Sequence, residues 1–231
     1  MLLTCVLCPV AHAYRPFDGG DAAVAGAGVL EIDTALNRHH RHGVHTQSLP
    51  ALTFTYGPDD DTEVSFGGRF AHHAHAPQEE HHITVDDIVL SFKHLLRRGS
   101  LQDEQGASVA LECGLLAPAL RGEDGAGAGC SGIVSHRVAA GTGHLTLTAT
   151  RNRAGQLSRY AGVVLEGPDS WRVRPALEAG IERTGGVYTR SVLAGLLWQL
   201  QNGPALGLAL RHANDGASIL ELRFGAKWSL H

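Results

Sequence analysis

The chain has 231 residues, a formal net charge of −4 with histidine neutral, and 29 glycines. This length suits one sizeable all-β domain, and the slightly acidic balance gives no reason to expect a nucleic-acid partner. No stretch approaches the roughly 18 consecutive apolar residues of a membrane helix. Any membrane role would therefore need a β-barrel, because only helices and closed barrels satisfy the backbone in lipid.

The first thirteen residues, MLLTCVLCPVAHA, form an apolar run that ends in the small-x-small pattern Ala11-His12-Ala13. This pattern predicts a cleaved export signal over residues 1–13 and a mature domain over residues 14–231. The run is short and contains no Lys or Arg, so we expect the true start to lie upstream. A buried N-terminal strand is the alternative interpretation.

Apolar and polar residues alternate along most of the mature chain, as strands with two different faces require. In WRVRPALEAGIE, residues 171–182, Leu177 and Ile181 share one parity, whereas Glu178 and Glu182 share the other. Twelve segments are predicted as strands in chain order: 28–37, 48–57, 62–72, 84–97, 105–117, 128–138, 143–151, 158–166, 171–183, 187–200, 204–213 and 219–230.

The connections between these segments fall into two classes. Every second one is built from turn-forming residues: GPDDD, RGSLQDE, AAGT, GPDS and NGP. The other class includes the two longest, RHHRHGVHTQ and HAHAPQEEHHIT. Bacterial single-chain barrels have an even number of strands and short periplasmic turns. The sequence therefore predicts an all-β fold, a transmembrane antiparallel up-and-down β-barrel of about 12 strands in the bacterial outer membrane.

In such a barrel the apolar parity faces lipid and the charged parity faces the lumen. The interior is then predicted to hold acids and bases in near balance, which indicates paired charges rather than one strongly selective field. A purely structural network and a role in passage both remain open for this set. The predicted lumen residues are Glu31, Asp33, Glu63, Asp87, Glu112, Glu166, Glu178, Glu182 and Glu221, with Arg69, Lys93, Arg172, Arg174, Arg211, Arg223 and Lys227.

A few large or charged residues of the lipid-facing parity mark the two rims. Arg151, Arg159 and Arg190 fall at the extracellular ends of their strands, where they would meet lipopolysaccharide phosphates or water. The aromatic residues Trp171, Trp198, Trp228 and Tyr56 fall at the periplasmic ends. An interfacial aromatic girdle is typical of transmembrane barrels.

Three stretches resemble a known family: YRPFDGGDAAVAGAGVLEID, DIVLSFKHLLRRGSLQ, and VVLEGPDSWRVRP with the last hairpins. They are similar to the outer-membrane transporters named for a meta-pathway of phenol degradation, over nearly the whole mature chain. The motif residues are Arg15-Pro16-Phe17 with Asp21, and Lys93-His94. The resemblance implies an outer-membrane channel for small, including aromatic, molecules, and it implies no catalytic residues.

The two longest connections are rich in histidine, which departs from the family pattern. Neutral imidazole is a good ligand for Zn, Ni and Cu, so the sequence raises a metal-capturing extracellular mouth as a hypothesis. A biased, solvated loop is the alternative. No HExxH motif occurs, so metalloprotease chemistry is unsupported. The candidate ligands are His39, His40, His42, His45, His72, His73, His75, His81 and His82.

We expect a channel or transporter for small molecules that needs no cofactor and is not an enzyme. A structural or adhesive barrel without transport is the main alternative. A hydrolase is less favoured, because His144 with Ser135 or Ser131 is conceivable but no nucleophile elbow surrounds either serine. Cys113 and Cys130 fall at similar depths of neighbouring strands. Strain argues against a cross-strand disulfide there, and a Cα separation beyond about 7 Å would exclude one.

Overall fold

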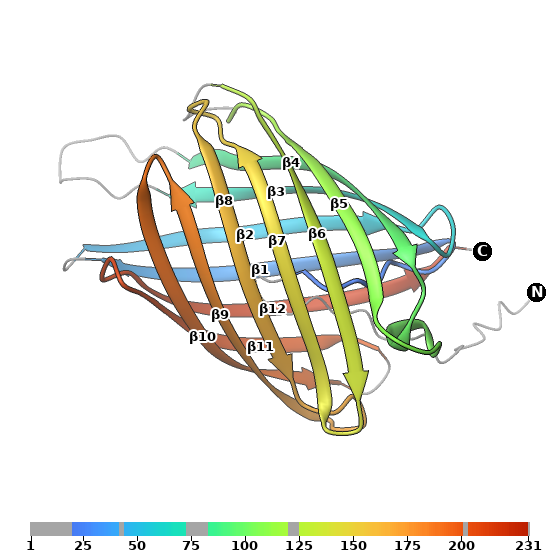
Figure 1. Ribbon diagram of the computed structural model, residues 1–231. Helices are drawn as coiled ribbons and strands as arrows, with labels where there is room; N and C mark the ends of the chain where they lie inside the picture. Colours follow the sequence, from blue (N-terminus) through green and yellow to red (C-terminus); the bar gives the residue numbers. More distant parts are fainter. Residues whose placement is uncertain (1–19, 42–43, 73–82, 120–124, 201–202, 231) are drawn as a thin grey trace, which may run out of the picture.

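The computed structural model describes residues 20–41, 44–72, 83–119, 125–200 and 203–230, and these form one closed barrel (Figure 1). The export signal, predicted for residues 1–13, lies outside the described residues. The strands are β1 (Val29–Arg41), β2 (Val44–Tyr56), β3 (Thr62–His72), β4 (Ile83–Arg97), β5 (Ser108–Leu116), β6 (Gly127–Val138), β7 (Gly141–Arg151), β8 (Leu157–Glu166), β9 (Val173–Thr184), β10 (Val187–Gln199), β11 (Ala205–Ala213) and β12 (Ser218–Ser229).

Each strand pairs antiparallel with its neighbours in sequence, and β1 pairs with β12 to close the barrel. The closing register runs from Val29 opposite Ser229 to His40 opposite Ser218. The only helical element among the described residues is a short 3₁₀ turn, η1 (Ser100–Gln102), between β4 and β5. No helix in the described part of the chain is long and apolar enough to cross a membrane. The predicted fold class is confirmed.

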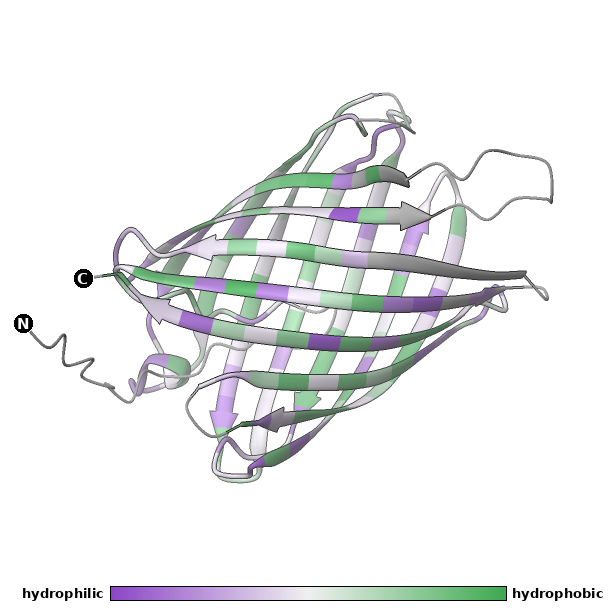
Figure 2. Ribbon diagram, turned by 180° about the vertical axis from the view of Figure 1, so that it is seen from behind, coloured by the Kyte–Doolittle hydropathy of each residue, from purple (hydrophilic) through white to green (hydrophobic). Residues whose placement is uncertain are grey.

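The two faces of the wall differ as the sequence pattern predicts. In β9, Leu177 is 57% exposed on the outside, whereas the next residue, Glu178, is 4% exposed. Purple and green alternate along the strands in Figure 2, which shows the same change of hydropathy from residue to residue. An outer wall of exposed leucine, valine and phenylalanine suits lipid, because apolar side chains have a lower free energy in lipid than in water.

Four exposed aromatic side chains gather at one rim of the barrel. Tyr56, Trp198 and Trp228 lie at or next to the ends of β2, β10 and β12, and Trp171 lies just before β9. All four lie at the rim with the short turns. This placement matches the aromatic girdle predicted for the periplasmic rim, and we use it to orient the barrel.

The interior is less polar than the sequence pattern predicts. Five buried apolar residues form one cluster on the inner face of β9, β10 and β11: Ala176, Leu193, Leu197, Ala205 and Ala209. A second cluster lies inside β4, β5 and β6 and includes Leu95, Ala110 and Ile133. Both clusters pack toward the centre of the barrel, so part of the lumen is filled with side chains.

Some element boundaries differ from those predicted. The strand β1 ends only at Arg41, and β2 already begins at Val44. The first histidine-rich connection is therefore largely a hairpin. His39, His40 and His45 therefore lie in strands rather than in a loop. At the other rim β9 begins at Val173, one residue after Arg172. Alternation stops at a strand end because no sheet partner holds the backbone extended beyond it.

The structure pairs Cys113 of β5 with Cys130 of β6 in a disulfide. The two residues are directly opposite in the register, and their Cα atoms are 4.0 Å apart. The side chains share the outward parity of Leu111 and Val134, which are exposed. The expectation against this bond was wrong, because the register places the two cysteines directly opposite each other without a shift.

The exposed outer wall gives a first prediction. Replacing Leu177 or Leu222 by arginine places a charge in the apolar belt and should lower the free energy of unfolding in lipid vesicles by about 2–4 kcal/mol. Leu230→Arg, just beyond the end of β12, is the control and should cost about 0–1 kcal/mol, since charges near the interface stay hydrated. Equal losses at Leu177 and Leu230 would contradict a lipid-facing wall.

Candidate functional site

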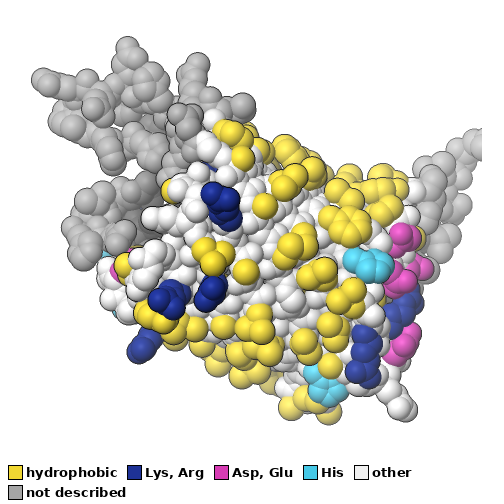
Figure 3. Space-filling model, turned by 45° about the horizontal axis from the view of Figure 1, so that its top comes forward, with side chains coloured by type: hydrophobic (Ala, Val, Ile, Leu, Met, Phe, Trp, Pro, Cys, Tyr) yellow, Lys and Arg dark blue, Asp and Glu magenta, His cyan; other side chains and the backbone are white. Residues whose placement is uncertain are grey.

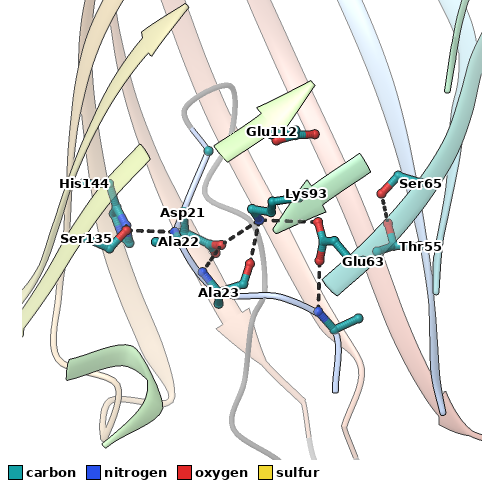
Figure 4. Close-up of polar contacts among 12 residues, drawn as sticks. Asp21, Ala22, Ala23, Thr55, Glu63, Ser65, Lys93, Glu112, Ser135 and His144 are labelled. Carbon is teal, nitrogen blue, oxygen red and sulfur yellow. Dashed lines mark hydrogen bonds and ion pairs between the residues drawn. The ribbon is translucent and has the colours of Figure 1, made fainter. Parts of the chain in front are cut away.

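A segment that precedes the first strand lies inside the barrel. Residues 20–28 run between β6 and β7 on one side and β3 and β4 on the other (Figure 4). Asp21, Ala22 and Ala25 are at most 5% exposed. The segment forms neither helix nor strand, so its buried backbone groups need partners on the surrounding wall. We call residues 20–28 the internal segment.

Lys93 of β4 is the main attachment of the internal segment. Its Nζ donates to the carbonyl oxygen of Ala23 at 2.6 Å and lies 3.4 Å from both Asp21 Oδ1 and Glu63 Oε1. The lysine is 1% exposed. A buried ammonium needs compensating charge and hydrogen bonds, and here the internal segment supplies one carboxylate and one carbonyl. The ion cluster is therefore complete only when the segment is in place.

The two carboxylates around Lys93 carry one more negative charge than the lysine balances. Backbone amides of the internal segment offset this excess. Ala25 donates its N–H to Glu63 Oε2 at 2.9 Å, and Ala23 donates to Asp21 Oδ1 at 3.0 Å. A hydrogen bond from a neutral N–H to a carboxylate is stronger than one between two neutral groups. The Ala25 contact therefore helps to hold the segment against the wall, whereas the Ala23 contact lies within the segment.

A second attachment joins the internal segment to β6 and β7. Ala22 donates its N–H to Ser135 Oγ at 2.9 Å, and that oxygen lies 2.8 Å from His144 Nδ1. His144 Nε2 is 3.4 Å from Glu166 Oε1. The chain thus assembles serine, histidine and carboxylate, as the hydrolase alternative requires. However, Ser135 is fully buried and its Oγ accepts the amide of Ala22, so no substrate carbonyl reaches it in this arrangement.

Ser131, the other serine of that alternative, hydrogen-bonds to Thr148 Oγ1 at 2.8 Å instead of to a histidine. Its side chain therefore bridges β6 and β7. In the described structure both serines stabilise the wall or the internal segment.

Apolar packing adds to these polar attachments. Ala22 is fully buried against Leu95, Ala110 and Ile133, and the 3₁₀ turn η1 contributes Leu101. A Cβ on Gly20 would lie 2.8 Å from Ile133 Cδ1, so any larger residue there would displace the end of the Ile133 side chain. The connection between β4 and β5 folds against the segment as well, since Gln102 Nε2 donates to the Ala22 carbonyl at 3.5 Å. The internal segment fills the lumen near the periplasmic rim.

Most of the predicted lumen residues form ion pairs on the inner face. Lys227 Nζ lies 2.6 Å from Glu31 Oε1, and Arg211 Nη2 lies 3.3 Å from Glu178 Oε1. The other pairs are Arg174 with Glu166, Arg69 with Asp87, and Arg223 with Glu221. Asp33 lies beside Glu31 and Lys227, and Glu112 accepts a hydrogen bond from Ser91. The pairing leaves little net charge on the inner wall.

Two predicted lumen residues lie elsewhere. Arg172 precedes β9, is exposed, and places its guanidinium 5.9 Å from the centre of the Trp198 ring on the outer wall. Glu182 has the inward parity but is exposed near the extracellular end of β9, where Ser158 and Thr184 donate to it. Both lie near strand ends, where the wall no longer separates a lipid side from a lumen side.

The histidine set is only partly described. His39 and His40 lie in β1, His45 in β2 and His72 in β3, while His42, His73, His75, His81 and His82 lie outside the described residues. In the register of β1 and β2, His40 is directly opposite His45. Within the described ranges no three His, Cys, Asp or Glu side chains lie together as a metal site would require.

The internal segment is the feature that strand patterning missed. It has no periodicity, and its apolar residues are alanines and a valine. One signal was present, since Asp21 and Lys93 belong to the motif residues quoted for the family resemblance, and they lie 3.4 Å apart. Motif residues far apart in sequence that carry opposite charge point to an ion pair, but the sequence alone does not place that pair inside a barrel.

No protein-family model and no curated protein sequence matches the chain. Solved structures match its fold. The COG4313 outer membrane channel from Pseudomonas putida F1 has a TM-score of 0.69 at 12% identity, over 92% of this chain and 100% of that one. The KdgM porin in complex with disordered oligogalacturonate has a TM-score of 0.61 at 8% identity, over 87% and 99%. The NanC porin has a TM-score of 0.58 at 8% identity, over 83% and 97%.

At these identities the likeness shows the fold. The first is named as an outer membrane channel, and the other two are named as porins. Together with the apolar outer wall and the aromatic rim, this fold places the chain in the bacterial outer membrane, as the sequence predicted.

The ion cluster around Lys93 gives a second prediction. Lys93→Met keeps most of the side-chain volume but leaves Asp21 and Glu63 without their cation. Breaking a buried pair in this way costs about 3–5 kcal/mol, so we expect the internal segment to detach and the amides of Ala22 and Ala25 to exchange hydrogen much faster. Lys227→Met, which breaks the more exposed pair with Glu31, is the control. Unchanged exchange at Ala22 and Ala25 in Lys93→Met would show that the cluster does not hold the segment.

Proposed function

We propose that the protein is an outer-membrane channel for small polar molecules, with a passage restricted by the internal segment. The observation that supports this most is the inner face, where charged pairs line a closed barrel with an apolar outer wall. Buried ion pairs give little stability compared with well-packed apolar side chains of similar volume. A wall that only had to be stable would not need them, whereas the polar lining of a passage does.

The composition of the inner face indicates the class of solute. Because acids and bases are paired along the wall, the field in the lumen has no dominant sign, and we expect weak selectivity between anions and cations. The family resemblance of the sequence extends the proposal to small aromatic molecules. The names of the structural neighbours are those of channels and porins, which supports the class of activity but not a substrate.

Conductance in planar bilayers tests the channel and the role of the segment together. Ala22→Pro removes the N–H that Ser135 accepts and adds bulk at a fully buried position, while it leaves the wall unchanged. We expect the wild type to give small conductance steps with a reversal potential near zero in a salt gradient, and Ala22→Pro to give larger steps. Ala27→Ser, at an exposed position of the same segment, should behave as the wild type.

Each outcome of that experiment separates two interpretations. If neither the wild type nor Ala22→Pro conducts, the barrel is structural or adhesive, as the main alternative holds. If both conduct equally, the channel stands but the internal segment does not restrict it.

We also propose that the histidines near the extracellular mouth bind a transition metal, Zn, Ni or Cu. The opposed pair His40 and His45 favours this, since directly opposite residues of an antiparallel pair have Cβ atoms roughly 4.5–5.5 Å apart on one face. In this proposal both residues of this pair contribute a ligand to one ion. Further ligands would come from histidines outside the described residues.

Calorimetry of the folded protein with zinc tests this site. Binding should weaken as the pH falls through about 6.5, because protonated imidazole does not bind metal. Replacing His39, His40, His42 and His45 together by alanine should abolish the heat at neutral pH, with His136→Ala, exposed near the periplasmic end of β6, as the control. Unchanged zinc affinity in the fourfold variant would contradict the site.

A further inference from the structure

Four arginines stand on the outer wall near the extracellular rim of neighbouring strands: Arg151 of β7, Arg159 of β8, Arg183 of β9 and Arg190 of β10. All four are exposed and have the outward parity. We call them the outer arginine patch. On the face drawn in Figure 3, Lys and Arg side chains stand among hydrophobic ones toward the end of the barrel away from the acidic turns.

The patch brings positive charges together, and no carboxylate among the described residues balances them. Arg159 and Arg183 are directly opposite each other in the register of β8 and β9, and like charges in that position repel. The acids of β7 to β10 are Glu166, Glu178 and Glu182, and all have the opposite, inward parity. Among the described residues no carboxylate forms an ion pair with these four arginines. Arg183 instead lies 5.3 Å from the centre of the Tyr188 ring.

An apolar depression adjoins the patch on the same lipid-facing surface. It has a volume of about 430 Å³ and is lined by Leu115, Ala128, Cys130 and Ala149, with Cys113, Gly114 and Gly129. The register joins the two features, because Ala128 is directly opposite Arg151 and Ala149 is directly opposite Arg159. The small side chains beside Cys130 create the hollow, and Leu115 forms one side of it.

We propose that the outer arginine patch binds the phosphates of lipid A, the anchor of lipopolysaccharide, and that one acyl chain of the same molecule lies in the depression. Arginine binds phosphate through paired, charge-assisted hydrogen bonds, and an anion between Arg159 and Arg183 removes their repulsion. The position fits the outer leaflet, since the patch lies at the rim opposite the aromatic girdle. The apolar depression favours a lipid over free phosphate, which has no group to fill it.

Native mass spectrometry of the folded protein in detergent, titrated with bisphosphorylated lipid A, tests the site. We expect the double variant Arg159→Gln/Arg183→Gln to bind roughly tenfold more weakly or worse, since two charge-assisted contacts are lost. Arg38→Gln, an exposed arginine on the distant strand β1, is the matched control and should bind as the wild type does. Circular dichroism shows whether each variant keeps its strand content.

Further binding measurements with other ligands and another variant identify what the patch recognises. Dephosphorylated lipid A should bind as weakly to the wild type as lipid A binds to the double variant, and inorganic phosphate should not displace lipid A at equal concentration. Ala149→Phe, which fills the depression, should weaken lipid A binding while all four arginines remain. Equal affinity of the double variant and the wild type, or of both forms of lipid A, would overturn the proposal. Displacement by inorganic phosphate would overturn its lipid part.

Discussion

Closure of the barrel by β1 and β12 is the constraint on which the rest of the structure depends. A sheet in lipid must leave no strand edge open, because an unpaired N–H or C=O has no water to bind there. The first and last strands therefore pair along nearly their full length, from Val29 opposite Ser229 to His40 opposite Ser218. Once the wall is closed, strict alternation divides every strand between lipid and interior, and the interior becomes the only place for charged side chains at mid-depth.

In the enclosed interior a charged side chain must be compensated by other groups of the protein. On an open surface water would hydrate Lys93 or Glu178, but here both are almost fully buried, so each must find an opposite charge or a hydrogen-bond donor within reach. Over most of the wall the partner comes from the same or a nearby strand, as for Arg211 and Glu178. At Lys93 the wall supplies Glu63, and the internal segment adds Asp21 and the Ala23 carbonyl. The segment is thus part of the charge balance of the lumen.

The period-two pattern predicted the fold because the alternation of apolar and polar residues is visible within each strand separately. It placed Glu178 inside and Leu177 outside correctly, since both lie in the middle of β9. It failed at strand ends such as Arg172, where the sheet no longer fixes the side-chain direction. It also could not find the contact of Ala22 with Ser135, which lie 113 residues apart. Alanine in a segment without periodicity carries no local signal, and only the folded wall shows where it packs.

The position of the internal segment in the chain constrains how the barrel can assemble. Among the described residues, the side chains that attach it lie between the β2–β3 turn and β7, from Asp60, which accepts the Ala27 N–H, to Thr146, which donates to the Gly20 carbonyl. The segment can therefore dock on the concave face of a half-built sheet before β8 to β12 are added. Once β12 has paired with β1 the segment cannot enter from the side, because the closed wall leaves no lateral entrance. A segment that binds early on this face would impose curvature on the sheet. The curved sheet would then close around the segment.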